Sequence, residues 1–245
     1  ATFARQKGIS TRCEFFTSAF ALELKQEGKQ ADIIHANNVM AHVPDINDFI
    51  EGIFTLLKPK GEAIIEVPYF LDLVQQLEFD TIYHEHVYYF ALKPLVFAFE
   101  RHGLEIFHVK KLPIHGGSLR LFVGHKGAFE RHVSVDQFLK IEKESNIFDL
   151  KTFSNFMERL DQLKGRLQEE LDYLKRADHR IAAYGASAKG TTLLNYFDIG
   201  HFLDFVVDKS REKQGKYTPG THLEIKDPKA LVKEKSTHAL LLVWN

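Results

Sequence analysis

One segment in the first third of the chain constrains the fold more than any other. Residues 31–36 (ADIIHA) predict a buried strand, and residues 46–57 place apolar side chains three and four positions apart, which is typical of a helix. We predict a turn at residues 58–61 (KPKG), followed by a second strand at residues 62–67 (EAIIEV). Strands that alternate with helices in this way form a parallel sheet covered by helices.

The rest of the sequence predicts further elements before and after this unit. We expect a short strand at 9–14, a helix at 16–25, helices between 71 and 102 with a break near Lys93 and Pro94, a hairpin of strands 105–109 and 119–123, a long amphipathic helix from Phe153 to Leu174, and a second strand–helix–strand unit from Arg180 to Asp208. The chain therefore reads as α/β throughout.

Composition excludes several classes of protein. The 245 residues are 44% apolar, enough for a core, and 32 basic residues against 33 acidic ones argue against a nucleic-acid binder. A single cysteine excludes a disulfide framework, and no apolar run is long enough for a membrane span or a signal peptide. We therefore expect a cytoplasmic protein. Because both ends read as interrupted elements, we also expect a fragment of a longer one.

Residues 79–90 (FDTIYHEHVYYF) gather two histidines, two acids and three tyrosines. The zinc motif HExxH fails because Tyr88 stands where its second histidine should be. His84 and His86 alone supply at most two ligands, so no metal site is predicted. Two alternatives stay open at this point: a polar cluster whose members satisfy one another, or a catalytic group.

Residues 185–191 (GASAKGT) form a second motif, a tight turn before a helix. The order of a phosphate-binding P-loop is scrambled, and Ser187 replaces the second glycine of the dinucleotide fingerprint. The free N–H groups of a helix start, together with Lys189, would nevertheless attract a phosphate. Because Asp208 follows as an acidic residue, an NAD-dependent nucleotide-sugar reductase or epimerase stays open as an alternative.

Four motifs in order resemble one enzyme family: ANNVMAHVPD at 36–45, YHEHVYYF at 83–90, HGGSLR at 115–120 and AAYGASAKGTTLLN at 182–195. They are similar to the S-adenosylmethionine-dependent C-methyltransferases of nucleotide-linked 4-keto-deoxysugars in antibiotic pathways. The resemblance runs from residue 1 to 245. It implies an N-terminally incomplete, Rossmann-like class I methyltransferase domain (1–127), a helical connector (128–178) and a second, C-terminally incomplete Rossmann-like α/β domain that binds the nucleotide-sugar (179–245).

The resemblance also implies a reaction and its catalytic residues. A methyl group would pass from S-adenosylmethionine to a carbon, C3, of a keto-sugar linked to thymidine diphosphate. His86 would be the base that removes the C3 proton, and Tyr83 would donate a hydrogen bond to the enolate oxygen O4. Glu85 would orient the base or hold a sugar hydroxyl.

Binding residues follow from the same resemblance. The cofactor would be held by Glu14 and Phe15 at its adenine and by Asn37, Asn38 and His42 near its methionine end. The substrate would contact His115, Ser118, Arg120, Tyr184, Gly185, Ser187 and Lys189. The family's zinc-binding domain and its glycine-rich cofactor loop have no counterpart in this sequence, so zinc is expected only in a missing domain. An inactive fragment is therefore a further alternative, and the oligomeric state stays open.

Overall fold

The computed structural model describes residues 1–244, and contacts between residues divide the chain into two compact units. The first unit comprises Ala1–Tyr69, Val87–Pro113 and Gly117–Ser145. The second comprises Phe70–His86, Ile114–Gly116 and the chain from residue 146 onward. The chain passes between the units several times, so neither unit is one continuous stretch of sequence.

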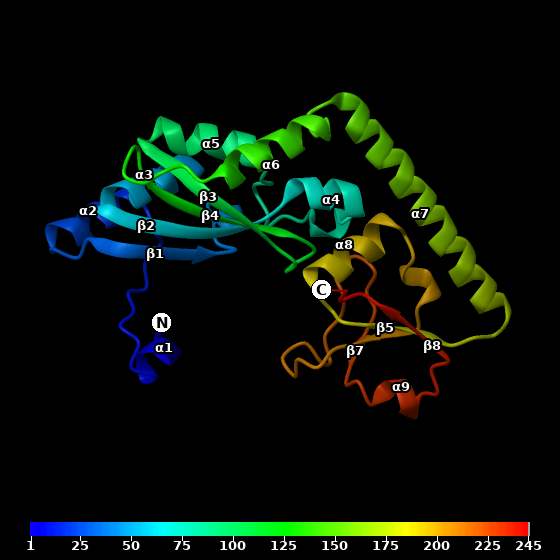
Figure 1. The fold of residues 1–245 in the computed structure, drawn as a ribbon. Coiled ribbons are helices and arrows are strands. Elements are labelled where there is room, and N and C mark those ends of the chain that lie inside the picture. The colour runs from blue at the N-terminus through cyan, green and yellow to red at the C-terminus, as the bar shows by residue number, and fades with distance from the viewer. Residues whose placement is uncertain (245) are drawn as a thin grey trace. The chain divides into compact units, whose positions relative to one another are not determined.

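The first unit is built on a four-stranded sheet with the order β1-β2-β4-β3 (Figure 1). β1 and β2 are parallel, as predicted, whereas β4 is antiparallel to both β2 and β3. The predicted burial of β1 is wrong, because β1 is an edge strand in this sheet and Ile33 is 62% exposed. The predicted hairpin thus extends the parallel pair into a mixed sheet. The elements of this unit are α1 (Thr2–Gln6), α2 (Ser18–Gln26), β1 (Ala31–Asn37), the 3-10 helix η1 (Met40–His42), α3 (Ile46–Leu56), β2 (Leu57–Pro68), α5 (Leu92–Arg101), β3 (Leu104–Leu112), β4 (Ser118–His125) and α6 (Val133–Glu144).

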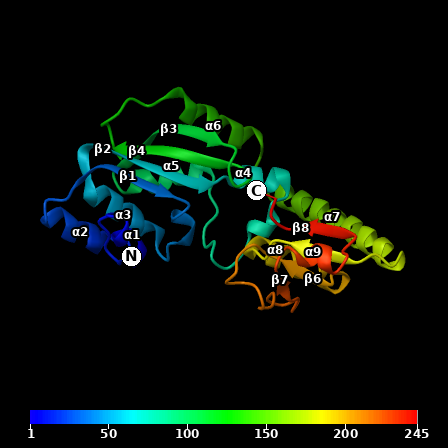
Figure 2. The same ribbon diagram turned by 90° about the horizontal axis from the view of Figure 1, so that it is seen from below.

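Helix α3 follows the β1 motif and packs on the sheet. It begins after Asp45, whose carboxylate accepts hydrogen bonds from the backbone N–H of Asn47 and Asp48. Its apolar face buries Phe49 and Ile50 completely or nearly so. α3 contacts both β2 and α5, and α5 contacts β3, so the two helices cover one face of the sheet (Figures 1 and 2). This packing holds the polar loop between β1 and α3 at the sheet edge.

The turn predicted at residues 58–61 is a bulge inside β2 instead. α3 passes directly into β2, where Ala31 pairs with Leu57 while Ile33 pairs with Glu62. Two steps along β1 therefore face five along β2, and the extra residues bulge out. The last residue of the bulge must be a glycine, because a Cβ there would lie 2.8 Å from the carbonyl oxygen of Ala31.

Two further predictions about secondary structure are wrong. Residues 9–14 form no strand, because no strand of residues 1–244 pairs with them, and Ile9 is exposed. The helical stretch between 71 and 102 does not break at Pro94, which lies in the first turn of α5. A proline is tolerated there because its missing N–H would have no partner in the helix. The break falls earlier, in the loop that carries the YHEH motif.

The second unit contains a four-stranded parallel sheet with the order β7-β6-β5-β8. The predicted strand–helix–strand unit is confirmed, since β5, α8 and β6 follow one another and the two strands are parallel neighbours. Its elements are α4 (Phe70–Gln76), the 3-10 helix η2 (Phe79–Thr81), α7 (Leu150–Arg176), β5 (Ile181–Tyr184), α8 (Ala188–Tyr196), the 3-10 helix η3 (Gly200–Phe202), β6 (Phe205–Val207), β7 (Ile225–Lys226), α9 (Ala230–Lys233) and β8 (His238–Leu241).

The long helix predicted from its apolar stripe is confirmed as α7, which runs for 27 residues without a break (Figure 1). Phe156, Leu160 and Leu171 of that stripe are buried. α7 contacts α4 within the second unit, whereas α6 contacts β3 within the first. The domain boundaries proposed from the sequence, 1–127, 128–178 and 179–245, stay a prediction.

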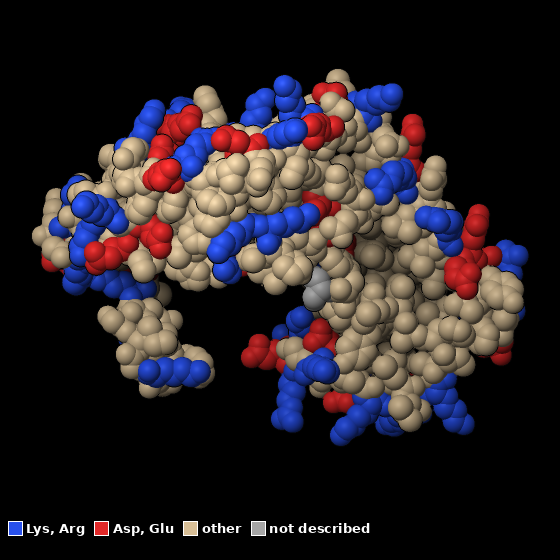
Figure 3. Space-filling model, viewed as in Figure 1, with Lys and Arg blue, Asp and Glu red and all other residues tan. Residues whose placement is uncertain are grey.

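On the face seen in Figure 3, basic and acidic side chains are interspersed, in keeping with the balanced charge of the sequence. Across the part of the chain that the structure describes, none of the helices is both long enough and apolar enough to cross a bilayer.

Candidate active site

The YHEH motif, residues 83–86, follows η2 in the second unit, and buried aromatic packing anchors η2. Phe79 of η2 stacks on Phe197, with ring centroids 4.7 Å apart, and both rings are almost fully buried. Thr81 closes the turn because its hydroxyl donates to the carbonyl oxygen of Glu78 at 2.7 Å. The residues after Thr81 form an irregular loop with a turn at His84 and Glu85. The motif therefore lies on a loop that starts from a rigid base.

Tyr83 and His86 form a hydrogen-bonded pair in this loop. The phenol oxygen of Tyr83 lies 2.9 Å from His86 Nε2, and His86 Nδ1 lies 3.0 Å from the carbonyl oxygen of Thr81. A carbonyl oxygen only accepts hydrogen bonds, so Nδ1 carries the proton. In the neutral ring, Nε2 then holds the lone pair and accepts from the Tyr83 hydroxyl. The fold thus selects the tautomer in which Nε2 is basic.

Burial keeps Tyr83 in its neutral form. Desolvation raises the pKa of the Tyr83 phenol above its ordinary value, and the negative charges of Glu85 and Asp80 raise it further. A phenol with a raised pKa stays protonated at neutral pH. Tyr83 is therefore suited to donate a hydrogen bond rather than to act as a base.

The other two polar residues of the motif face solvent. The side chain of His84 is 89% exposed and that of Glu85 is 61% exposed, with His84 Nε2 4.0 Å from a Glu85 carboxylate oxygen. An ion pair at this separation and exposure contributes little to stability. The structure therefore brings Tyr83 and His86 together by a hydrogen bond, whereas the side chain of Glu85 lies in solvent.

Three predicted cofactor residues lie together after β1 in the first unit. Asn37 ends the strand, and Asn38, with a φ of +51°, donates its N–H to the carbonyl oxygen of Glu66 at 2.9 Å. The side-chain oxygen of Asn38 is buried and has no hydrogen-bond partner among residues 1–244. A buried acceptor without a donor is costly unless a ligand or water supplies one. This oxygen suits the amino group of S-adenosylmethionine. His42, the third of these residues, ends the 3-10 helix η1 that follows.

The backbone after His86 is tied to the same region of the first unit. The N–H of Val87 donates to the carbonyl oxygen of Ala41 at 2.9 Å, and the Tyr88 hydroxyl donates to that of Pro44 at 3.2 Å. Ala41 precedes His42 within η1. The two strongest motifs of the sequence, ANNVMAHVPD and YHEHVYYF, are therefore joined by direct hydrogen bonds.

Glu14 and Phe15, the other two predicted cofactor residues, lie elsewhere. Both are exposed, Phe15 by 88%, in the irregular segment that replaces the predicted strand. They line a hollow with Arg12 and Cys13 near the start of α2, in which neither Asn38 nor His42 takes part. Because no strand forms there, nothing fixes these two side chains at the carboxyl edge of the sheet.

The predicted substrate residues of HGGSLR divide between two environments. In the first unit, Arg120 of β4 donates through two nitrogens to one oxygen of Glu66 on β2, at 2.9 and 2.7 Å, and Glu66 is buried. Ser118 is fully buried between the strands. His115 precedes the left-handed Gly116, which contacts Glu78 in the second unit. Sequence reasoning did not reveal that Arg120 is already paired within the sheet.

The loop after β5 uses most of its N–H groups internally. Gly185 donates to Val207 at 2.7 Å, Ala186 donates to Asp208 at 2.8 Å, and Gly190 donates to the Ser187 hydroxyl at 3.0 Å. Because α8 begins at Ala188, the N–H groups of residues 187–189 have no partner within the helix, and Tyr184 ends the preceding strand. The helix start keeps the features that attract a phosphate.

Two features of this loop depart from a dinucleotide site. A Cβ on Gly185, whose φ is +99°, would lie 2.5 Å from Val243, so the glycine accommodates a neighbouring segment rather than a ligand. Asp208 accepts from Ala186 and from the N–H of Ser210 at 2.8 Å each. These bonds lower the pKa of Asp208 although burial opposes them. The carboxylate that would bind a ribose is therefore engaged within the fold, which disfavours the NAD-dependent alternative.

Lys189 faces two residues that sequence reasoning did not select. Its amine is buried, lies 4.4 Å from the ring centroid of Trp244 and has no hydrogen-bond partner among the described residues. Trp244 in turn donates to Asp80 at 2.6 Å. Burial lowers the pKa of Lys189, and the charges of Asp80 and Glu78 oppose that shift. No sequence pattern links Asp80 to Trp244, because 164 positions separate them.

Comparison with known proteins places the chain in a family. Residues 113–245 match a family model described as a C-methyltransferase C-terminal domain, and residues 3–109 match a methyltransferase domain. The first match alone covers more than half of the chain. The predicted α/β fold with a methyltransferase domain is thereby confirmed.

Individual relatives agree with these matches. C-methyltransferase NovU of Streptomyces niveus is 32% identical over 244 residues, which are 99% of this chain and 58% of that protein. Crystal structures of M1.HpyAVI and of the M1.HpyAVI-SAM complex align over 46% and 47% of this chain and 54% and 55% of theirs, at 14% and 15% identity. Both TM-scores are 0.30, too low to support an argument. From the family matches, the chain belongs to the C-methyltransferases.

Proposed function

We propose that the protein transfers a methyl group from S-adenosylmethionine to C3 of a nucleotide-linked 4-keto-deoxysugar, with His86 as the base. The observation that supports this most is the hydrogen-bonded series from Thr81 through His86 to Tyr83. It presents an imidazole whose Nδ1 donates to the Thr81 carbonyl and whose Nε2 faces a protonated phenol. Membership of the C-methyltransferase family supports the reaction class. The chain spans 58% of the relative's length, so the activity of the whole protein is part of the proposal.

The chemistry requires a carbon nucleophile, which a C–H bond beside a ketone supplies once its proton is removed. His86 Nε2 takes the C3 proton, while the electron pair of the C–H bond moves into the enolate with oxygen O4. Tyr83 donates its O–H to O4 instead of to His86 when substrate binds. This change of acceptor makes the lone pair on His86 Nε2 available to the C3 proton. Substrate binding and activation of the base therefore occur together.

The cofactor supplies an electrophilic methyl group when it is bound. Asn37, Asn38 and His42 would hold its methionine end, and the unpartnered side-chain oxygen of Asn38 supports that assignment. Glu14 and Phe15 stay a proposal for the adenine that their exposed positions do not favour.

The substrate's diphosphate, thymidine diphosphate in this proposal, would lie at the start of α8. Residues 187–189 offer backbone N–H groups, and the Lys189 amine offers its charge. Tyr184 and His115 complete the proposed substrate set. Gly185 and Ser118 stay a proposal that their packing does not favour, because Val243 lies against Gly185 and Ser118 is fully buried. Arg120 would contact substrate only through donors that Glu66 does not occupy, because two of its nitrogens bind that carboxylate.

Proton exchange tests the base without any cofactor. The chain is mixed with a thymidine-diphosphate-linked 4-keto-6-deoxyhexose in D2O, and the C3 proton signal is followed by NMR. We expect the signal to disappear with the wild-type chain and to persist with His86→Gln. His84→Gln is the matched control, because this neighbouring histidine is 89% exposed.

Three outcomes would count against the proposal. Exchange by His86→Gln at the wild-type rate would refute the base assignment. Absence of exchange from a wild-type sample that melts cooperatively would refute the proposed substrate or support an inactive fragment. Energy transfer from Trp244, the single tryptophan of the chain, to added NADH would instead support the NAD-dependent alternative.

A further inference from the structure

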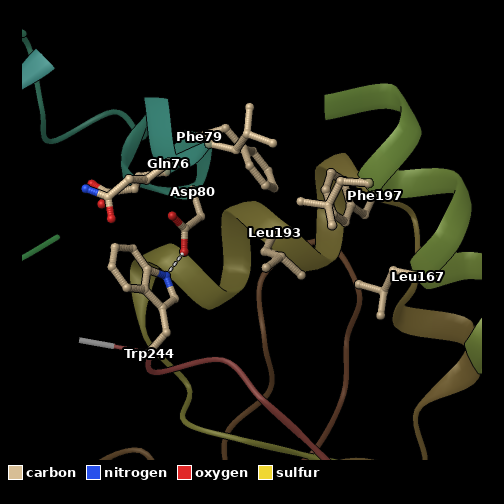
Figure 4. Close-up of a pocket in the computed structure, with 10 residues that line it drawn as sticks. Gln76, Phe79, Asp80, Leu167, Leu193, Phe197 and Trp244 are labelled. Carbon is tan, nitrogen blue, oxygen red and sulfur yellow. Dashed lines mark hydrogen bonds between the residues drawn. The ribbon is translucent and has the colours of Figure 1, made fainter. Parts of the chain in front are cut away.

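A cavity of about 340 Å³ opens in the second unit beside η2 (Figure 4). Its walls are mostly apolar and come from the end of α4, η2, α7, α8 and Trp244. At its edge, Trp244 Nε1 donates a hydrogen bond to Asp80 at 2.6 Å, and Figure 4 shows the indole turned toward this carboxylate. The residue nearest the end of the described chain is therefore bonded to η2, the rigid base of the YHEH loop.

Asp80 is almost completely buried, with 2% of its surface exposed, and its carboxylate accepts from the indole N–H and from the backbone N–H groups of Asp80 and Thr81. A buried carboxylate without a compensating hydrogen bond or charge is strongly disfavoured. The indole N–H supplies one such bond, and the Lys189 amine, on the indole face at 4.4 Å, supplies a positive charge. We call Trp244, Asp80 and Lys189 the Trp244 clamp. The negative charge of Glu78 also acts on the Lys189 amine.

The clamp is one residue away from the group that orients His86. Asp80 and Thr81 are consecutive in η2, and the Thr81 carbonyl accepts the hydrogen bond from His86 Nδ1. Because the two residues are consecutive, we expect a displacement of Asp80 to move the Thr81 carbonyl, the acceptor that selects the His86 tautomer. At its other end the clamp holds the buried Lys189 amine, which lies on the face of the indole and has no hydrogen-bond partner in residues 1–244.

We propose that the Trp244–Asp80 hydrogen bond positions His86, so that Trp244 and Asp80 are positioning residues that connect the buried Lys189 amine to the orientation of the base. This inference rests on the proposed function for the role of His86, but not for its geometry. It goes beyond the family assignment, because it places part of the base's support on a tryptophan 158 positions after it in the sequence.

Histidine tautomers measured by NMR test the clamp without substrate. Long-range 1H–15N spectra of the chain labelled with 15N-histidine report which ring nitrogen carries the proton, and His86→Gln identifies the His86 signals. We expect the Nδ1-protonated neutral ring in the wild type. Trp244→Phe and Asp80→Ala should shift His86 toward a mixture of tautomers.

Two matched control variants leave the hydrogen bond from Trp244 intact. One changes the charge of residue 80 but not its volume, and the other changes only the cavity. Asp80→Asn retains an oxygen acceptor for the indole N–H and should keep the wild-type His86 signals. Leu163→Ala enlarges the same cavity and changes no member of the clamp, so it should also keep them. If Trp244→Phe does not melt cooperatively, the comparison of Asp80→Ala with Asp80→Asn decides.

The results separate the clamp from the proposed function. Wild-type His86 signals in folded Trp244→Phe and Asp80→Ala, or equal shifts in Asp80→Ala and Asp80→Asn, would overturn the clamp. In the exchange assay, folded Trp244→Phe should lose about tenfold in kcat with KM within twofold, since phenylalanine keeps a ring beside Lys189. Shifted tautomers without exchange by the wild type would refute the proposed function and leave the clamp standing. Proton exchange that is present in the wild type and is not slowed by Trp244→Phe would refute the positioning role of the clamp and leave the proposed function standing.

Discussion

The ion pair between Arg120 and Glu66 allows a sharp test of a residue first assigned to substrate binding. Arg120→Met removes both hydrogen bonds from Glu66, whose side chain is only 3% exposed, and keeps an unbranched side chain of similar length. The carboxylate would be left in the sheet without its cation. We therefore expect Arg120→Met to destabilise the first unit.

The magnitude follows from the exposure of the two partners. Removing one member of a fully buried pair costs about 3–5 kcal/mol. Arg120 is itself 35% exposed, so water reaches the pair and the cost should be lower, about 2–3 kcal/mol. Glu66→Gln combined with Arg120→Met removes the stranded charge. The double variant should therefore be less destabilised than the two single variants added together.

Hydrogen exchange measured by mass spectrometry suits this test, because it reads β2 and β4 separately from the second unit. The free energy of opening should fall in peptides that cover Leu119–Val123 and Ala63–Val67, which pair directly. Urea unfolding followed by circular dichroism supplies the overall change. A decrease in the free energy of unfolding below about 0.5 kcal/mol, on the order of an exposed ion pair, would refute a structural role for Arg120. Substrate binding would then be the role to test.

Three further outcomes are expected. Gly185→Ala should destabilise the second unit by more than Gly215→Ala in urea unfolding. Both glycines have a positive φ, worth about 1–2 kcal/mol, but only Gly185 would place a Cβ 2.5 Å from Val243. Burial lowers the pKa of His108 below its ordinary value of 6.5, so the folded state binds fewer protons. Stability should therefore fall as pH drops below 6.5, and His108→Phe should reduce that fall in urea midpoints. Lys189→Met should raise KM for the nucleotide-sugar about tenfold or more and lower kcat less, because a charge-assisted bond is lost on binding. A fall in kcat by the same factor as the rise in KM would contradict this expectation.

Local elements were predicted where one periodicity or one cap decides the conformation. The stripe that includes Phe156 and Leu160 predicted α7 because a helix of that length needs a continuous apolar face. β1 was predicted from a run of apolar residues that has few alternatives. The errors arose where a neighbouring strand decides. Lys58–Gly61 has the composition of a turn, yet pairing on both sides absorbs it into β2 as a bulge.

The candidate site was predicted in part. Tyr83 and His86 lie close in sequence, and the structure joins them by a hydrogen bond. Their roles in catalysis stay a prediction, as do those of Asn37, Asn38 and His42. Sequence reasoning could not foresee that Glu66 engages Arg120 or that internal bonds engage Asp208, because both partners depend on which strands and loops become neighbours.

The sequence by itself determined the α/β class, the long helix and the membership in the C-methyltransferase family. These properties depend on side chains a few positions apart, where local geometry or direct comparison suffices. Only the tertiary structure decided that Trp244 donates to Asp80, that Val243 packs against Gly185 and that Arg120 pairs with Glu66. Contacts between distant residues form only once the chain has paid the entropy of bringing them together, and periodicity carries no record of which pairs those are.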